Sequence, residues 1–99
     1  MSNAVYFVSF KLKKGASVPH FLLAAEKLNN GYMSKQKGYI SWKQLNDGET
    51  WADLITFETM KDAKKVSQPS GINDLAEKFY SFINLSSCKS HLFSVEKEY

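Results

Sequence analysis

The chain has 99 residues, of which 43% are hydrophobic and 23% charged, and this composition fits one globular domain with a modest core. The absence of an apolar run near the roughly 20 residues of a membrane span, and of a secretory leader, predicts a cytoplasmic protein without a membrane partner. The single cysteine, Cys88, excludes an intrachain disulfide. All 13 basic residues are lysines, and the lack of arginine argues against specific recognition of phosphate or carboxylate groups.

The first half of the chain predicts a strand followed by a helix. Residues 5–12 alternate between a wholly apolar face and a half-apolar face, which favours a central strand covered on both sides. Ser17 is a good helix N-cap, and Pro19 is tolerated in the first helical turn. Apolar residues then recur every three or four positions, which predicts an amphipathic helix that ends near Met33.

The middle of the chain predicts a hairpin that leads into a second helix. A strand over residues 39–45, with Ile40 and Trp42 on one face, is followed by the turn signal Asp47-Gly48, because both residues tolerate positive φ. In the next strand four side chains share one face: Trp51, Asp53, Ile55 and Phe57. Thr59 and Asp62 resemble a helix-opening capping box with Asp in place of Glu.

The remaining segment predicts a broken helical region and a last strand. Pro69-Ser70-Gly71 breaks the second helix, and an apolar stripe from Ile72 to about Phe82 or Ile83 continues it. Residues 84–96 end in alternation and predict the fourth strand. The βαββαβ order predicts an α+β, ferredoxin-like antiparallel sheet with helices on one face. Its other face would be apolar, and a homodimer that pairs sheet against sheet would cover it.

The chain resembles the dimeric α+β-barrel superfamily and its antibiotic-biosynthesis-monooxygenase-like domains. The resemblance is carried by residues 8–15, by Lys37-Gly38-Tyr39-Ile40, by residues 51–57 and by Lys61-Asp62-Ala63. It implies a homodimeric α+β barrel, with residues 5–99 as a single ferredoxin-like domain. We expect residues 1–4 to be a tag scar or a disordered start.

The resemblance implies a pocket between sheet and helices that binds an aromatic or phenolic small molecule. Cofactor-independent oxygenases of this superfamily oxidise such substrates, so we expect no cofactor. Asp53 is the candidate catalytic base, because a buried carboxylate with a raised pKa could take a phenol proton. Trp51, Tyr6 and Phe57 are the candidate substrate-binding residues. A non-catalytic dimer, whose pocket is filled by its own side chains, stays open as the alternative.

Two other functions fit the sequence less well. The haem-degrading relatives carry an Asn on the first strand, a Trp that ends the third strand and a helical His. Val8 and Phe57 occupy the two nearest strand positions, and residues 59–84 contain no His. RNA-recognition motifs share the βαββαβ order, and Lys37-Gly38-Tyr39 matches the start of their stacking signature. The match then fails at Ile40, so we expect no nucleic-acid partner.

The sequence predicts no metal site. It contains two histidines and one cysteine, and the spacing of Cys88 and His91 puts them on opposite faces of a regular strand. His20 falls in the first turn of the first helix, where a surface position is the simplest interpretation.

Overall fold

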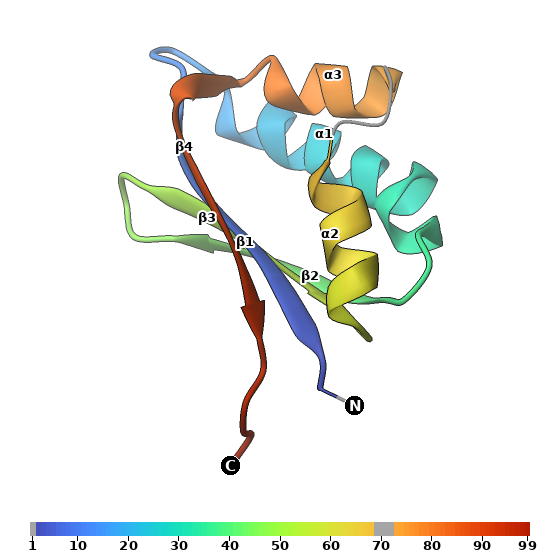
Figure 1. The fold of residues 1–99 in the computed structure, drawn as a ribbon. Helices are drawn as coiled ribbons and strands as arrows, with labels where there is room; N and C mark the ends of the chain where they lie inside the picture. The colour runs from blue at the N-terminus through green and yellow to red at the C-terminus, as the bar shows by residue number, and fades with distance from the viewer. Residues whose placement is uncertain (1, 69–72) are drawn as a thin grey trace.

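A computed structural model describes residues 2–68 and 73–99. The chain forms a four-stranded antiparallel sheet with its helices gathered on one side (Figure 1). In chain order the elements are β1 Ala4–Leu12, α1 Val18–Gly31, the short 3₁₀ helix η1 Met33–Lys35, β2 Tyr39–Asn46, β3 Trp51–Phe57, α2 Met60–Ser67, α3 Asp74–Tyr80 and β4 Ile83–Ser94. The strand order is β2-β3-β1-β4, which is the expected ferredoxin-like arrangement.

Strand β1 is central, as its two apolar faces predicted. It pairs with β3 along one edge and with β4 along the other. Phe10 is 2% exposed and faces the helices, whereas Val5 and Phe7 lie on the opposite face of the sheet and are only half-buried. The strand begins at Ala4, which is itself buried against the second core cluster, one residue before the expected boundary.

Helix α1 begins where the sequence predicted. The Ser17 side chain accepts a hydrogen bond from the His20 backbone N–H at 3.3 Å, and Pro19 lies in the first turn. Phe21, Ala25 and Leu28 are buried against the sheet because they recur on one face of the helix. The helix ends at Gly31 and is followed by η1, so the regular helix is slightly shorter than the apolar pattern indicated.

The hairpin between β2 and β3 forms, but its turn differs from the expected one. Asn46 pairs with Trp51, so residues 47–50 make a four-residue loop. Only Gly48 has positive φ in this loop, at 101°. Asp47 instead accepts backbone hydrogen bonds from Glu49 and Thr50 at 2.9 and 2.7 Å. The Asp47 side chain therefore stabilises the loop as a hydrogen-bond acceptor, and the Asp47 backbone does not adopt the left-handed conformation.

Strand β2 contains an irregularity that corrects one sequence prediction. The register between β2 and β3 shifts between Tyr39 and Ser41, and both Tyr39 and Trp42 pack toward the helices. Ile40 is 45% exposed and therefore does not share the buried face of Trp42. An extra residue in a strand breaks the two-residue alternation, and alternation was the basis of that prediction.

The second half of the helical layer follows its capping residues. Thr59 Oγ1 accepts from the Asp62 backbone N–H at 3.1 Å, so the expected N-cap forms. The Asp62 carboxylate accepts from the Thr59 hydroxyl at 2.9 Å, whereas in a capping box it would accept from the Thr59 backbone N–H. Asn73 caps α3 by accepting from the backbone N–H groups of Leu75 and Ala76. The predicted break at residues 69–71 and Ile72 lie outside the described residues.

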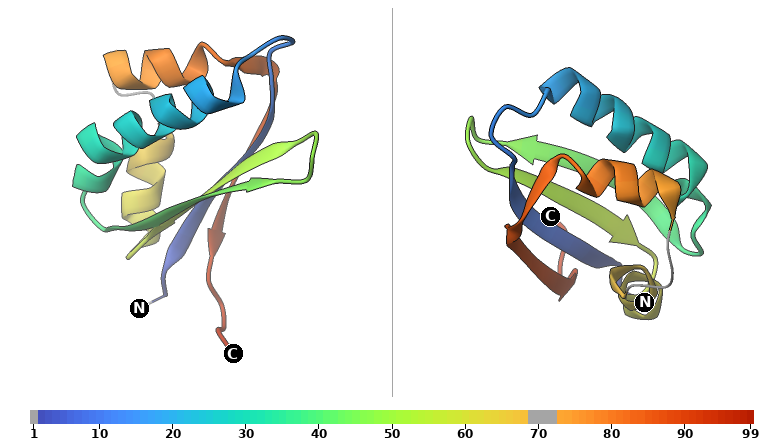
Figure 2. Two further views of the ribbon diagram at one scale, coloured as in Figure 1. Left: turned by 180° about the vertical axis from the view of Figure 1, so that it is seen from behind. Right: turned by 90° about the horizontal axis from the view of Figure 1, so that it is seen from above.

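The helices cover one face of the sheet, and the other face is uncovered (Figure 2). The uncovered face carries Val5, Phe7 and Leu54, together with Phe93, which is 52% exposed. His91 stacks on Phe93 there, with ring centroids 5.6 Å apart. None of the helices in the described ranges combines the length and apolar character that a membrane-spanning helix requires.

Candidate functional site

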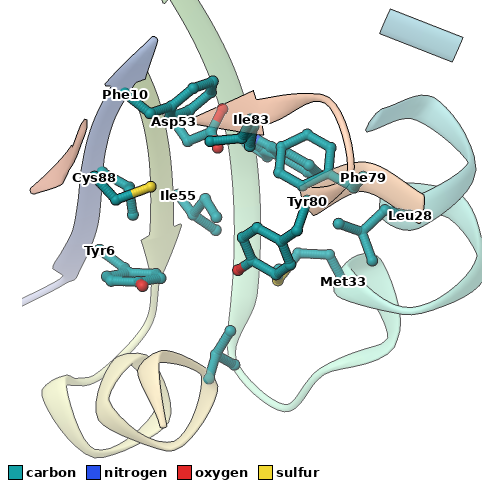
Figure 3. Close-up of a pocket in the computed structure, with 13 residues that line it drawn as sticks. Tyr6, Phe10, Leu28, Met33, Asp53, Ile55, Phe79, Tyr80, Ile83 and Cys88 are labelled. Carbon is teal, nitrogen blue, oxygen red and sulfur yellow. The ribbon is translucent and has the colours of Figure 1, made fainter. Parts of the chain in front are cut away.

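A narrow cavity of about 50 Å³ lies between the sheet and the helical layer (Figure 3). Its walls are mostly apolar, with a few polar side chains among them. The lining residues are Tyr6, Val8, Phe10, Leu28, Met33, Trp42, Asp53, Ile55, Val66, Phe79, Tyr80, Ile83 and Cys88. They come from all four strands, all three α-helices and η1, so the tertiary fold assembles the cavity.

Asp53 is the buried carboxylate of this cavity. It is 5% exposed because it lies on the helix-facing side of β3, between Trp51 and Ile55. Gln44, directly opposite on β2, donates to Asp53 Oδ1 from Nε2 at 3.2 Å. Burial raises the pKa of Asp53 to about 6, although Trp42 and Gln44 both act to lower it. The group can therefore exchange a proton near neutral pH.

Trp42 supplies an unused hydrogen-bond donor beside this carboxylate. Its indole N–H faces Asp53 closely enough to lower the pKa of that group. The nitrogen is nevertheless fully buried, and no acceptor in residues 2–68 or 73–99, Asp53 included, completes a hydrogen bond with it. Leaving a buried donor unpaired typically costs about 1–3 kcal/mol. A ligand oxygen placed near Asp53 would remove that cost.

Three further titratable side chains line the cavity away from Asp53. Figure 3 shows the Cys88 sulfur and the Tyr80 hydroxyl turned toward the space between sheet and helices, with Tyr6 nearby. Burial raises the pKa of Tyr80 to about 12, with smaller contributions from Tyr6 and Asp53, although the residue as a whole is 46% exposed. Burial also raises the pKa values of Tyr6 and Cys88. All three groups are therefore neutral at pH 7.

The apolar walls are held by packed aromatic rings. Phe79 stacks on Phe21 with centroids 5.2 Å apart, and Phe10 meets both rings edge to face. Trp42 also packs edge to face on Phe79, at 5.7 Å. These contacts fill most of the space between the layers, which explains why the remaining cavity is small.

The four residues that the sequence singled out occupy two kinds of position. Asp53 and Tyr6 line the cavity together. Trp51 lies behind the wall, edge to face with Phe21 at 5.2 Å, and Phe57 is fully buried in the second core cluster. Both therefore support the residues that line the cavity, and neither faces it.

Sequence reasoning missed Tyr80, Gln44 and the cavity position of Cys88. Tyr80 is the last residue of α3, and nothing in the apolar stripe indicates that its hydroxyl turns toward the cavity. The sequence did contain one feature that could have identified Gln44 as a neighbour of Asp53. Gln44 lies on the same strand face as Trp42, and the hairpin register places it opposite Asp53.

No group of three His, Cys, Asp or Glu side chains in the described part of the chain is arranged to hold a metal ion. His20 is exposed at the start of α1. Cys88 lines the cavity and His91 lies on the uncovered face, so the two point to opposite sides of β4 as predicted.

No protein-family model and no curated protein sequence matches the chain. Solved structures do match it along almost its whole length. SnoaB, a cofactor-independent oxygenase from Streptomyces nogalater, matches with a TM-score of 0.76 at 9% identity, over 99% of this chain and 97% of its own. Structures of candidate antibiotic biosynthesis monooxygenases from other bacteria also match.

Two further matches illustrate how varied the proteins with this fold are. A dimeric protein of ferredoxin-like fold from Bacteroides fragilis matches with a TM-score of 0.62 at 17% identity, over 94% of this chain and 96% of its own. A hydroxynitrile lyase from Passiflora edulis matches with a TM-score of 0.66 at 14% identity, over 98% of this chain and 96% of its own. The chain thus has the fold of the antibiotic-biosynthesis-monooxygenase-like structures, as the sequence resemblance implied. Such low identities establish the fold alone.

Proposed function

We propose that the chain binds a small aromatic or phenolic molecule between its sheet and its helices, and that Asp53 accepts a proton from it. The observation that supports this most directly is the buried carboxylate, with a pKa of about 6, on the wall of an apolar cavity. A general base works best when its pKa lies near the operating pH. Asp53 meets that condition, because it is largely ionised at pH 7 and yet readily takes up a proton.

The reaction that this site fits is a cofactor-independent, monooxygenase-like oxidation. Removing the proton of an electron-rich phenol gives an anion that can itself pass electrons to dioxygen. Tyr6 would form part of the binding wall, while Trp51 and Phe57 would stiffen it from behind. The oxygenase with the same fold makes this chemistry a reasonable first test, although the lyase shows that the fold also serves other reactions.

The size of the cavity favours one alternative, a non-catalytic protein whose pocket is filled by its own side chains. Ligand sites usually measure about 300–1,000 Å³, whereas this cavity measures about 50 Å³. One engineered cavity that binds benzene measures about 150 Å³. An aromatic ligand therefore requires the cavity to open.

Dioxygen uptake with electron-rich naphthols separates these functions. The proposed function predicts uptake by the wild-type protein and none by Asp53→Asn, with both variants folded at pH 7. A dye that fluoresces in apolar sites provides the second measurement. Saturable dye binding without oxygen uptake would leave a binding protein, and the failure of both would leave the self-filled pocket.

We further propose that the protein is a homodimer that pairs the uncovered faces of two sheets. The exposed Phe93 and the half-buried Val5 and Phe7 form an apolar surface there, and such surfaces usually mark an interface. The matching Bacteroides protein is dimeric.

Native mass spectrometry tests the homodimer by looking for a species of twice 11.3 kDa. Phe93→Lys should raise the dissociation constant of the dimer at least about tenfold, because aromatic side chains dominate such interfaces. Leu23→Lys, at an exposed position on α1, is the matched control. A wild-type monomer, or equal effects of the two variants, would contradict the proposed interface.

A further inference from the structure

A second hollow lies on the surface beside the cavity, and the two share one side chain. The outer hollow is a groove of about 230 Å³ between α1 and β2. Leu22, Ala25, Glu26 and Asn29 line it from the helix, and Trp42 and Gln44 line it from the strand. Trp42 also lines the inner cavity, so its indole forms part of the wall between the groove and Asp53.

No well-aligned hydrogen bond in the described part of the chain holds this indole in place, although its N–H lies close enough to Asp53 to lower the pKa of that carboxyl. Its buried N–H has no partner there, and its ring is positioned by edge-to-face packing on Phe79. Trp42 belongs to the edge strand β2, and its side chain packs against both core clusters, so it turns aside only when the neighbouring core side chains adjust. Gln44 is the other barrier, because it lines the groove while it donates to Asp53 at 3.2 Å.

The sizes of the two hollows explain why both would be needed. At about 50 Å³, the inner cavity is much smaller than an engineered cavity of about 150 Å³ that binds benzene. Joined to the groove, it approaches the lower end of the range for small-molecule sites, about 300–1,000 Å³. An aromatic ring therefore fits only if it occupies the groove as well.

We propose that the ligand enters from the groove between α1 and β2, and that it is a one- or two-ring phenol whose hydroxyl group hydrogen-bonds to both Asp53 and Trp42. This proposal rests on the proposed function and adds the route and the recognition of the ligand. Trp42 swings aside to join the hollows, and the ring of the ligand lies against Leu22 and Ala25.

A phenolic hydroxyl matches the two protein groups because it donates one hydrogen bond and accepts another. The ionised Asp53 carboxylate only accepts, and the indole N–H only donates. A hydroxyl between them satisfies the buried donor and delivers its proton to the base. A hydrocarbon of the same shape would leave the donor unpaired, and it should bind about tenfold more weakly.

Titration of the ¹⁵N-labelled protein with 2-naphthol at pH 8 tests the proposal, with naphthalene as the matched probe that lacks the hydroxyl. The chain has two indole N–H signals, from Trp42 and Trp51, and Trp42→Phe identifies the first. We expect 2-naphthol to move the Trp42 proton signal downfield, as a new hydrogen bond does. Naphthalene controls for the effect of the ring alone.

Two pairs of measurements probe the route and the hydrogen bond. Leu22→Tyr narrows the groove and should weaken 2-naphthol binding about tenfold, whereas Leu23→Tyr, at a neighbouring exposed position outside the groove, should not. Trp42→Phe removes the N–H and also makes the side chain smaller, so the two probes are compared with each other: it should weaken 2-naphthol binding about tenfold relative to naphthalene binding. Thermal melting checks that each variant is folded.

The outcomes distinguish this inference from the function on which it rests. Binding of 2-naphthol that Leu22→Tyr and Trp42→Phe leave unchanged would overturn the route and the recognition, while a ligand-binding function would stand. Equal binding of naphthalene and 2-naphthol would overturn the hydroxyl recognition. No binding of 2-naphthol to the folded wild-type protein would overturn both the inference and the phenol-binding function.

Discussion

Replacing Asp53 by Asn should stabilise the protein at neutral pH, even though it changes a buried side chain that accepts a hydrogen bond. The pKa of Asp53 is about 6 in the folded chain and 3.8 for an unperturbed aspartate. At 1.36 kcal/mol per pKa unit, this difference means that the ionised carboxylate costs the folded state about 3 kcal/mol. An Asn side chain can still accept the Gln44 hydrogen bond, and it carries no charge to bury.

The sign of the pH dependence follows from proton binding. Because the folded state binds the Asp53 proton more tightly than the unfolded state, wild-type stability gains from this group as the pH falls from 8 through 6 toward 4. The Asn variant lacks this contribution. Its advantage should be about 3 kcal/mol at pH 8 and should shrink to about 0.6 kcal/mol at pH 4, where the folded state is almost fully protonated and the unfolded state is about 40% protonated.

Urea unfolding followed by circular dichroism, at pH 8 and pH 4 and one fixed protein concentration, measures both differences. Asp47→Asn is the matched control, because the fold lowers the pKa of Asp47 and the expected change in stability therefore has the opposite sign. Backbone hydrogen bonds from Thr50 and Glu49 lower the pKa of exposed Asp47, so its replacement should cost stability at pH 8 and not in acid. A loss of stability in Asp53→Asn at pH 8 would refute the reasoning and make the carboxylate a structural acceptor.

Two smaller changes test the local structure of the chain. Gly38→Ala should destabilise the folded protein more than Gly15→Ala, although both glycines have φ of +80°. A Cβ at position 38 would clash with the Asp62 side chain, whereas a Cβ at position 15 would meet no other atom. We expect Gly15→Ala to lower the free energy of unfolding by about 1 kcal/mol through backbone strain alone, and Gly38→Ala to lower it by clearly more. Urea unfolding measures both losses, and equal losses would contradict the steric argument. Thr59→Ala removes the cap of α2 and should lower the free energy of unfolding by about 1 kcal/mol. Ser67→Ala, at the other end of the same helix, should lower it by less. A larger loss for Ser67→Ala would show that the cap is unimportant.

The sequence alone determined the order of the elements and most of their faces. Alternation grouped Phe10 with Tyr6 on one strand face and Asp53 with Ile55 on another, because a regular strand has a fixed period of two, but it left open which face of residues 5–12 the helices cover. The caps at Ser17 and Thr59 were readable because their hydrogen bonds close within three residues. Local rules failed at Ile40, where an irregular strand breaks the period, and at the hairpin turn, whose length depends on the register of both strands.

The tertiary structure alone decided what surrounds Asp53. The sequence predicted a buried carboxylate with a raised pKa. Gln44 lies opposite it through strand register, while Tyr80 and Cys88 line the same cavity through packing between distant parts of the chain. The small volume of the cavity depends on how the rings of Phe21, Phe79 and Trp42 fill the space between the layers. Side-chain packing depends on three-dimensional shape, and the spacing of apolar residues along the sequence does not determine it.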